Sequence, residues 1–162
     1  MLHIGSFSKT ISPSLRLGFM VVPQELSRRF GEIAACLAPA PAAAVQRAVA
    51  ELLRQGCYLR HLRHMKRLYA ARRETLLHCL REKPQSSIKV QATAGLAVVI
   101  SLPELASDVD IASRALQVGL APAPLSPWYV QSRRHQGLLL GVTNLNEGRL
   151  MTDCRQLLNL VR

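Results

Sequence analysis

The chain has 162 residues, of which 49% are hydrophobic, so it is long enough to bury one core and lacks the low hydrophobicity of disordered proteins. Its longest apolar stretches, such as residues 95–102, are too short to cross a bilayer, which predicts a cytoplasmic chain without a membrane span. The formal net charge of +11 suits a nucleic-acid or other anionic partner, but charge alone does not establish one.

The chain opens with two predicted strands around a polar loop. A short apolar segment at 2–4 ends at Gly5, and a second apolar run at 17–22 ends at Pro23. The Ser-rich stretch between them contains Lys9.

Two amphipathic helices are predicted next. The first is indicated by apolar side chains at spacings of four, three and four, namely Leu26, Phe30, Ile33 and Leu37. The Pro39/Pro41 pair ends this helix, and Pro41 suits the first turn of the second, which stops at Gly56. The side chains expected to face inward from the second helix are Val45, Val49 and Leu52.

Residues 57–83 predict one long basic helix with eight Lys or Arg against two Glu. At ~1.5 Å per residue it would extend for roughly 35 to 40 Å, enough to connect two subdomains. Pro84 ends it and marks an internal boundary.

Beyond Pro84 the pattern predicts a small α+β unit. Its expected elements are strands at 88–91 and 95–102, a helix at 107–118, strands at 120–123 and 137–143, and a helix at 146–161. Ser107, with Asp110 three residues later, resembles a capping box at the start of the first of these helices.

Cysteines and histidines give no metal or redox motif. The four cysteines form no CxxC pair, so reduced, buried thiols are the better interpretation; they are Cys36, Cys57, Cys79 and Cys154. His61 and His64 lie three apart on the long helix, but no third ligand follows in register, so we expect no metal site.

Lys9 has the setting of a reactive lysine. A lysine forms a Schiff base with an aldehyde cofactor when its neutral amine is populated. Ser6 and Ser8 precede Lys9, and Arg16 follows it at the start of an apolar run. Two hydroxyls and a guanidinium fork are suitable donors for a phosphate group. Gly18 leaves room for close backbone packing beside Arg16.

The segment 5–19 reads GSFSKTISPSLRLGF and resembles the segment of class I/II aminotransferases that carries the pyridoxal 5'-phosphate (PLP) lysine. The MVVP that follows is typical of the subgroup fused to a GntR-type winged helix, the MocR-type transcriptional regulators. The resemblance continues in RHLRHMKRLY at 60–69, GL at 95–96, PLS at 124–126 and GLLLG at 137–141. The chain therefore resembles the C-terminal part of a fold-type-I PLP-dependent aminotransferase domain.

This resemblance implies an α/β fold in three parts. Residues 1–56 would be the remnant of the large PLP-binding domain with its parallel sheet, 57–83 the connecting helix, and 84–162 the small α+β domain. The aspartate and the aromatic side chain that clamp the PLP ring in such domains, and the winged helix, would precede Met1. We therefore expect a truncated domain whose isolated form is inactive.

The resemblance also assigns roles to four residues. Lys9 would be the catalytic lysine bonded to PLP, and Ser6, Ser8 and Arg16 would hold the cofactor phosphate. The alternatives are loop capping for the two serines, a surface ion pair for Arg16 and a solvated loop amine for Lys9.

Two positions depart from the aminotransferase pattern. Leu139 stands where typical aminotransferases have the arginine that pairs with the substrate carboxylate, and Ala97 stands where many relatives have a histidine. Without a bidentate anchor an α-amino acid is held less firmly, which makes ordinary transaminase activity doubtful. Arg133 or Arg134 is a possible substitute for the missing arginine.

Three functions compete at this point. The first is the effector-sensing domain of a MocR-type regulator, with PLP on Lys9, a small amine or amino acid as ligand, a homodimer as the full-length form, and DNA bound through the winged helix. The second is a fragment of a catalytic aminotransferase. The third is a small basic protein that binds nucleic acid through the long helix, although aromatics are only 4% of the chain.

Overall fold

The computed structural model describes residues 1–38, 40–82, 88–130, 135–146 and 148–161. These form two compact units, Met1–Met65 and Lys66–Arg162, and helix α3 (Cys57–Glu82) contributes its first turns to one unit and its remainder to the other. In the described ranges, no helix combines the length and the apolar character that a membrane crossing requires. The three-part division that the sequence suggests stays a prediction.

The first unit begins with a β-hairpin. Strands β1 (His3–Ser6) and β2 (Gly18–Val21) pair antiparallel, with Ile4 opposite Met20 and Ser6 opposite Gly18. Two short 3-10 turns, η1 (Phe7–Lys9) and η2 (Pro13–Leu15), form the connection between them. Both predicted strands are confirmed, and every strand pair in the described residues is antiparallel.

Helices α1 (Gln24–Leu37) and α2 (Ala43–Arg54) follow, as predicted. Their apolar faces are largely uncovered: Leu37 is 80% exposed, and Leu52, which was expected to face inward, is 37% exposed. Only Val49 of α2 is buried, where it joins Phe7 and Leu17 in a small core.

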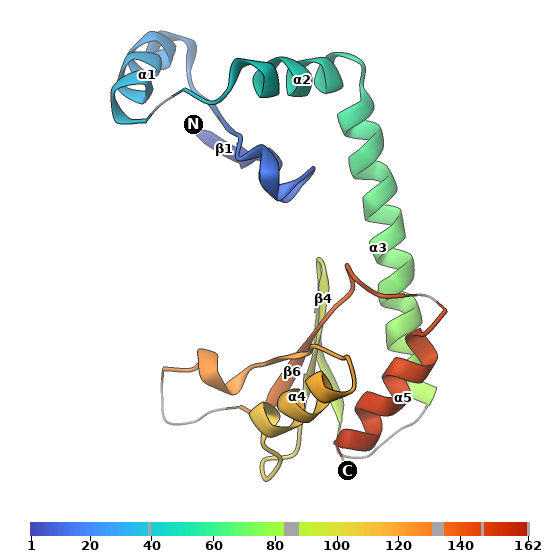
Figure 1. Ribbon diagram of the computed structural model, residues 1–162. Coiled ribbons are helices and arrows are strands. Elements are labelled where there is room, and N and C mark those ends of the chain that lie inside the picture. Colours follow the sequence, from blue (N-terminus) through green and yellow to red (C-terminus); the bar gives the residue numbers. More distant parts are fainter. Residues whose placement is uncertain (39, 83–87, 131–134, 147, 162) are drawn as a thin grey trace. The chain divides into compact units, whose positions relative to one another are not determined.

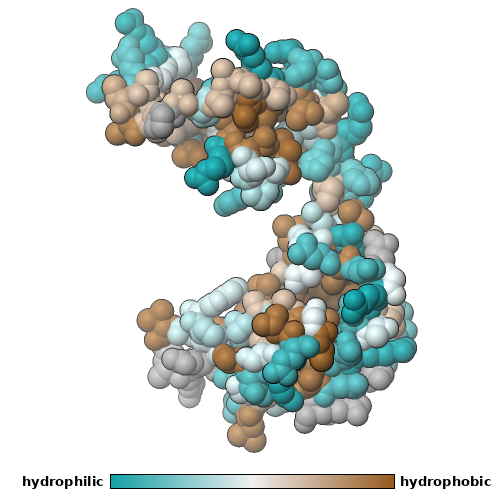
Figure 2. Space-filling view, viewed as in Figure 1, coloured by the Kyte–Doolittle hydropathy of each residue, from teal (hydrophilic) through white to brown (hydrophobic). Residues whose placement is uncertain are grey.

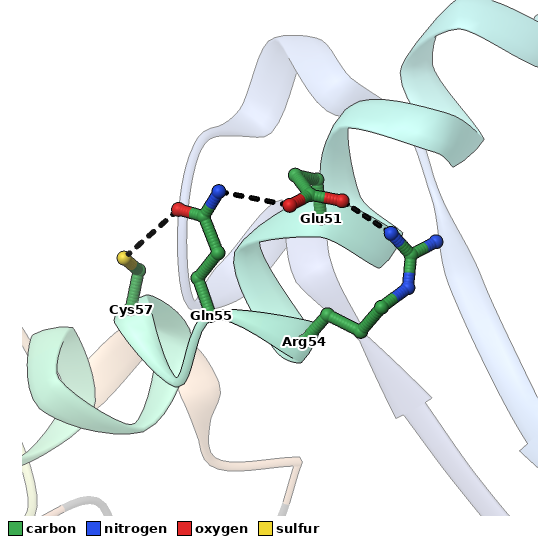
Figure 3. A network of polar contacts seen from close by, with 4 residues as sticks. All are labelled: Glu51, Arg54, Gln55 and Cys57. Carbon is green, nitrogen blue, oxygen red and sulfur yellow. Dashed lines mark hydrogen bonds and ion pairs between the residues drawn. The ribbon is translucent and has the colours of Figure 1, made fainter.

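A polar network fixes the corner between α2 and α3 (Figure 3). The Glu51 carboxylate accepts hydrogen bonds from Arg54 and, at 2.8 Å, from Gln55 Nε2, while Cys57 Sγ donates to Gln55 Oε1 at 3.7 Å. Gly56 makes the turn with a φ of 68°, a left-handed conformation that glycine adopts without strain. The corner thus combines a left-handed glycine with exposed side-chain hydrogen bonds.

The second unit contains a four-stranded antiparallel sheet in the order β3-β4-β6-β5. The strands are β3 (Lys89–Ala94), β4 (Ala97–Ser101), β5 (Ala123–Pro124) and β6 (Gly137–Gly141). Helices α4 (Asp108–Gln117) and α5 (Leu150–Leu160), together with η3 (Ser126–Trp128), complete it. The predicted α+β unit is therefore confirmed (Figure 1), except that the strand expected at 120–123 is replaced by the two residues of β5, which share only Ala123 with it.

The core of this unit joins the sheet to three helices. Alternation along the strands places Val98, Ile100 and Leu138 at 0% exposure. They pack in one cluster with apolar side chains from α4, α5 and the C-terminal half of α3. Cys79 and Cys154 belong to this cluster and are buried, but Cys36 is exposed and Cys57 is half-buried, so the expectation of four buried thiols holds for only two.

Candidate functional site

The loop that carries Lys9 connects β1 to β2 and is closed by backbone pairing at its base. Phe7 N donates to Leu17 O at 2.9 Å, which extends the hairpin ladder by one step. Both residues are buried, at 6% and 8% exposure, whereas Lys9, two residues after Phe7, is exposed. The loop therefore has a buried apolar base, and the amine lies in its exposed part.

Two glycines of the motif allow the hairpin to pack closely. A Cβ atom on Gly5 would lie 2.3 Å from Phe19 Cζ, and one on Gly18 would lie 3.0 Å from Gly5 O. The Phe19 ring packs against Phe7, with 5.1 Å between their centroids. The close backbone packing expected at Gly18 is confirmed.

The four predicted cofactor residues all lie in this one hairpin. Ser6 and Ser8 are half-buried, while Lys9 and Arg16 are exposed. Within the described part of the chain, none of these four side chains makes a hydrogen bond or ion pair with the protein. Other hydroxyls of the loop are engaged: Ser12 Oγ and Ser14 Oγ are 2.8 Å apart. The donors named from the sequence therefore remain available to a ligand.

Arg16 has a strained backbone conformation. Its φ is 45° and its ψ is 36°, which makes it the only non-glycine residue with positive φ in the described ranges. A left-handed conformation costs roughly 1 kcal/mol in a residue with a Cβ, and such strain concentrates at functional sites. Glycine or asparagine would adopt this conformation more easily than arginine.

Thr10, the residue after Lys9, is held from α3. Its Oγ1 donates to Ser6 O at 3.3 Å and accepts from Tyr58 Oη at 3.1 Å, and His61 Nε2 lies 2.9 Å from Thr10 O. The Tyr58 ring also packs edge-on against Phe7 at 5.5 Å. The sequence interpretation missed Thr10 and Tyr58 and considered His61 only as a metal ligand. The available signal was that Tyr58 and His61 lie three apart and share a helix face.

The positions that depart from the aminotransferase pattern lie in the sheet of the second unit. Leu139 is half-buried in β6, and its register partners are Val99 and Ala123, both without a charge or hydroxyl. Ala97 is half-buried opposite Gly141. The possible substitutes Arg133 and Arg134 lie outside the described residues. No group of three or more potential metal ligands is present in the described ranges.

Asp108 is a buried carboxylate that the sequence interpretation also missed. It is 0% exposed, and its Oδ2 accepts from Ser126 N at 2.8 Å, Leu125 N at 3.0 Å and Gly137 N at 3.2 Å, while Oδ1 accepts from Ser126 Oγ at 2.6 Å. Burial raises its pKa, but these hydrogen bonds outweigh burial and lower the pKa below the ordinary 3.8. Asp108 thus ties η3 and β6 to the start of α4. The capping bond predicted beside it, from Asp110 N to Ser107 Oγ, is present at 3.2 Å.

Comparison with known proteins gives relatives of two kinds, while no protein-family model matches the chain. The chain is 30% identical over 147 residues to the probable rhizopine catabolism regulatory protein MocR of Rhizobium meliloti. It is 27% identical over 158 residues to the 2-aminoadipate transaminase of Thermus thermophilus. These alignments cover 90% and 97% of this chain but only 30% and 40% of the relatives.

The structure resembles solved aminotransferases over almost its whole length. The crystal structure of LysN, the α-aminoadipate aminotransferase of Thermus thermophilus complexed with N-(5'-phosphopyridoxyl)-L-leucine, matches with a TM-score of 0.79 at 25% identity. The match covers 99% of this chain and 41% of LysN. The chain therefore spans less than half the length of the proteins it resembles.

Proposed function

Because the chain has the fold of the C-terminal portion of a fold-type-I aminotransferase, and its relatives are MocR-type regulators and aminotransferases, we propose that it binds PLP through Lys9 as part of an effector-sensing domain. The observation that carries the proposal is the Lys9 hairpin, where one exposed amine and three further side chains are free of partners within the described residues.

The residues of the hairpin fit the cofactor. PLP supplies an aldehyde that takes up amines covalently. The hydroxyls of Ser6 and Ser8 each donate one hydrogen bond, and the Arg16 guanidinium can bind two phosphate oxygens at once. The strained backbone at Arg16 is consistent with a side chain needed for a ligand.

Sensing is favoured over turnover by the surroundings of Leu139. Leu139 and its partners across the strands, Val99 and Ala123, offer no charge that could pair with a carboxylate. Without a charged anchor an amino acid depends on its amine, which would take the place of the Lys9 amine on the PLP aldehyde; this permits exchange but not the fixed geometry that catalysis needs. We propose a small amine or amino acid as the effector. We further propose that the longer protein is a homodimer that binds DNA through an N-terminal winged helix, as in a MocR-type regulator.

Borohydride trapping tests the proposal directly. The sequence contains four lysines, Lys9, Lys66, Lys83 and Lys89, so peptide mapping after incubation with PLP and reduction assigns each label. We expect most label on Lys9, its loss in Lys9→Ala, and no change in the control Lys66→Ala, since Lys66 is exposed on α3. Label spread evenly over the four lysines and unchanged in Lys9→Ala would contradict the proposal.

The phosphate contact has its own matched test. Arg16→Gln removes the guanidinium and should lower labelling of Lys9 by about 10-fold, the effect of losing one charge-assisted contact of about 1.4 kcal/mol. The control Arg28→Gln removes an arginine that is 91% exposed on α1 and should leave labelling unchanged. Equal labelling in the two variants would remove Arg16 from the site.

Catalytic transamination is the second candidate, because the 2-aminoadipate transaminase aligns with 97% of this chain. It predicts that a PLP-loaded protein converts an amino acid to its keto acid. The sensing proposal predicts ligand exchange at Lys9 without keto-acid release, so a keto-acid assay separates the two functions.

A further inference from the structure

The Lys9 side chain and the next residue, Thr10, differ in how many contacts hold them. The Lys9 side chain makes no hydrogen bond or ion pair in the described residues. Thr10 is bonded through its amide, its hydroxyl and its carbonyl: Thr10 N donates to Phe7 O at 3.2 Å, and the other bonds reach Ser6, Tyr58 and His61. A free reactive group thus stands beside a residue that is fixed from α3.

The hydroxyls form a directed relay. Tyr58 Oη donates to Thr10 Oγ1, and Thr10 Oγ1 donates its own proton to the Ser6 carbonyl. Each hydroxyl has one proton, so this order satisfies both donors without conflict. The relay joins α3 to the residue whose side chain is proposed to bind phosphate and closes the turn from Ser6 to Thr10 around Lys9.

His61 supplies the second connection. A carbonyl oxygen only accepts hydrogen bonds, so the 2.9 Å contact to Thr10 O requires the proton on His61 Nε2. Glutamine can donate from a similar position, while leucine cannot. This difference separates the hydrogen bond from the bulk of the side chain.

We propose that Tyr58 and His61 are positioning residues that act through Thr10 to hold the Lys9 amine at a fixed place relative to the phosphate donors Ser6, Ser8 and Arg16. This inference rests on the proposed function. The four bonds on Thr10 carry it, all within the first unit. Positioning of this kind matters because a displacement of about 1 Å between binding and reacting groups can cost about 100-fold in rate.

The test compares PLP with pyridoxal, which has the same aldehyde but no phosphate. Positioning makes labelling of Lys9 depend on the phosphate, so the wild-type chain should prefer PLP by at least about 10-fold. In Tyr58→Phe and Thr10→Val the preference should fall to about 2-fold, because the amine and the phosphate donors are no longer held together. A structural defect alone would weaken labelling by both aldehydes equally.

Conservative variants provide the rescue. Thr10→Ser keeps the hydroxyl, and His61→Gln keeps the donor, so both should stay within about 2-fold of the wild-type preference, whereas His61→Leu should lose it. His64→Leu is the surface control, since His64 is exposed on the same helix. The amides of Thr10 and Ile11 both donate to Phe7 O. Hydrogen exchange of the Ile11 amide should accelerate at least about 10-fold in Tyr58→Phe and in Thr10→Val.

The outcomes separate the two proposals. Unselective labelling of the wild-type chain would sink the proposed function and this inference with it. Selective labelling of Lys9, with an unchanged PLP preference in Tyr58→Phe and Thr10→Val, would overturn the inference alone. Accelerated exchange without a change in preference would also overturn it, because the contacts would then serve only the stability of the loop.

Discussion

The two units of the chain are held together in different ways. In the described residues, seventeen buried side chains form the core of the second unit, but only Phe7, Leu17 and Val49 form that of the first. The first unit also leaves large apolar side chains open, since Ile4 is 71% and Leu37 is 80% exposed. Brown, hydrophobic areas are visible on both units in Figure 2. The unit without Lys9 therefore has much the larger apolar core.

Each unit also has one residue that makes several hydrogen bonds to distant segments, Asp108 in the second unit and Thr10 in the first, and the two differ in charge and burial. Asp108 is charged, fully buried and bonded to three backbone amides and a hydroxyl. Thr10 is neutral and half-buried, and its partners come from the first turns of α3. Hydrogen bonds to buried charged groups contribute more than those between neutral groups. The contacts of Asp108 should therefore contribute more to stability than those of Thr10.

Truncating a core side chain should show the difference in packing between the two units most strongly. Leu138→Ala removes a side chain at 0% exposure and should lower the free energy of unfolding of the second unit by about 3 to 4 kcal/mol. Leu37→Ala, on the exposed face of α1, should change stability by less than about 0.5 kcal/mol. Urea unfolding with segment-resolved hydrogen exchange measures both. Similar losses in the two variants would contradict the contrast in packing.

Neutralising the buried carboxylate should have the next largest effect. Asp108→Asn places an amide group against backbone N–H donors and should destabilise the second unit by about 2 to 3 kcal/mol. The control Asp110→Asn lies two residues away, on an exposed carboxylate paired with Arg114, and should cost less than about 0.5 kcal/mol. The fluorescence of Trp128, the single tryptophan, reports locally because it lies two residues from Ser126.

Acid should remove the contribution of Asp108 to the free energy of unfolding. Its folded-state pKa lies below the ordinary 3.8, so the folded protein binds fewer protons than the unfolded chain near that pH. The stabilisation is therefore fully present above about pH 3.8 and is lost as the pH falls through the lower folded value. Unfolding curves between neutral pH and about pH 2 should show this loss in the wild type and a smaller one in Asp108→Asn. If the wild type and Asp108→Asn lost the same stability on acidification, the loss would have to come from other carboxylates.

Two glycine substitutions should have smaller effects than Leu138→Ala and Asp108→Asn, and effects of opposite sign. Gly5→Ala places a Cβ 2.3 Å from the Phe19 ring and should destabilise the hairpin by about 1 to 2 kcal/mol. Gly31→Ala, inside α1 with nothing within 4 Å, should stabilise the helix by up to about 1 kcal/mol through helix propensity. Thermal unfolding followed by circular dichroism compares them. Stabilisation by both would show that the Phe19 ring moves aside freely.

Local pattern was enough to predict most of the elements. Apolar spacing located the helices at 24–37, 43–54 and 57–82 to within a few residues, and Ser107 was correctly predicted as a cap. Burial was predicted less well, since Leu52 and Cys36 are exposed where the sequence suggested buried positions. Amphipathic spacing fixes which side chains share a face, but not whether another element covers that face.

The grouping of Lys9 with Ser6, Ser8 and Arg16 could be predicted from residue order, because these residues lie within a few positions of one another. The long-range contacts became visible only in the folded chain: Tyr58 and His61 bond to Thr10 across separations of 48 and 51 residues, and Asp108 accepts hydrogen bonds from amides 17 to 29 residues away. The left-handed backbone conformation of Arg16 was likewise not predictable from residue order. Hydrogen bonds between distant segments and strained torsions depend on how those segments pack, and residue spacing does not encode that packing.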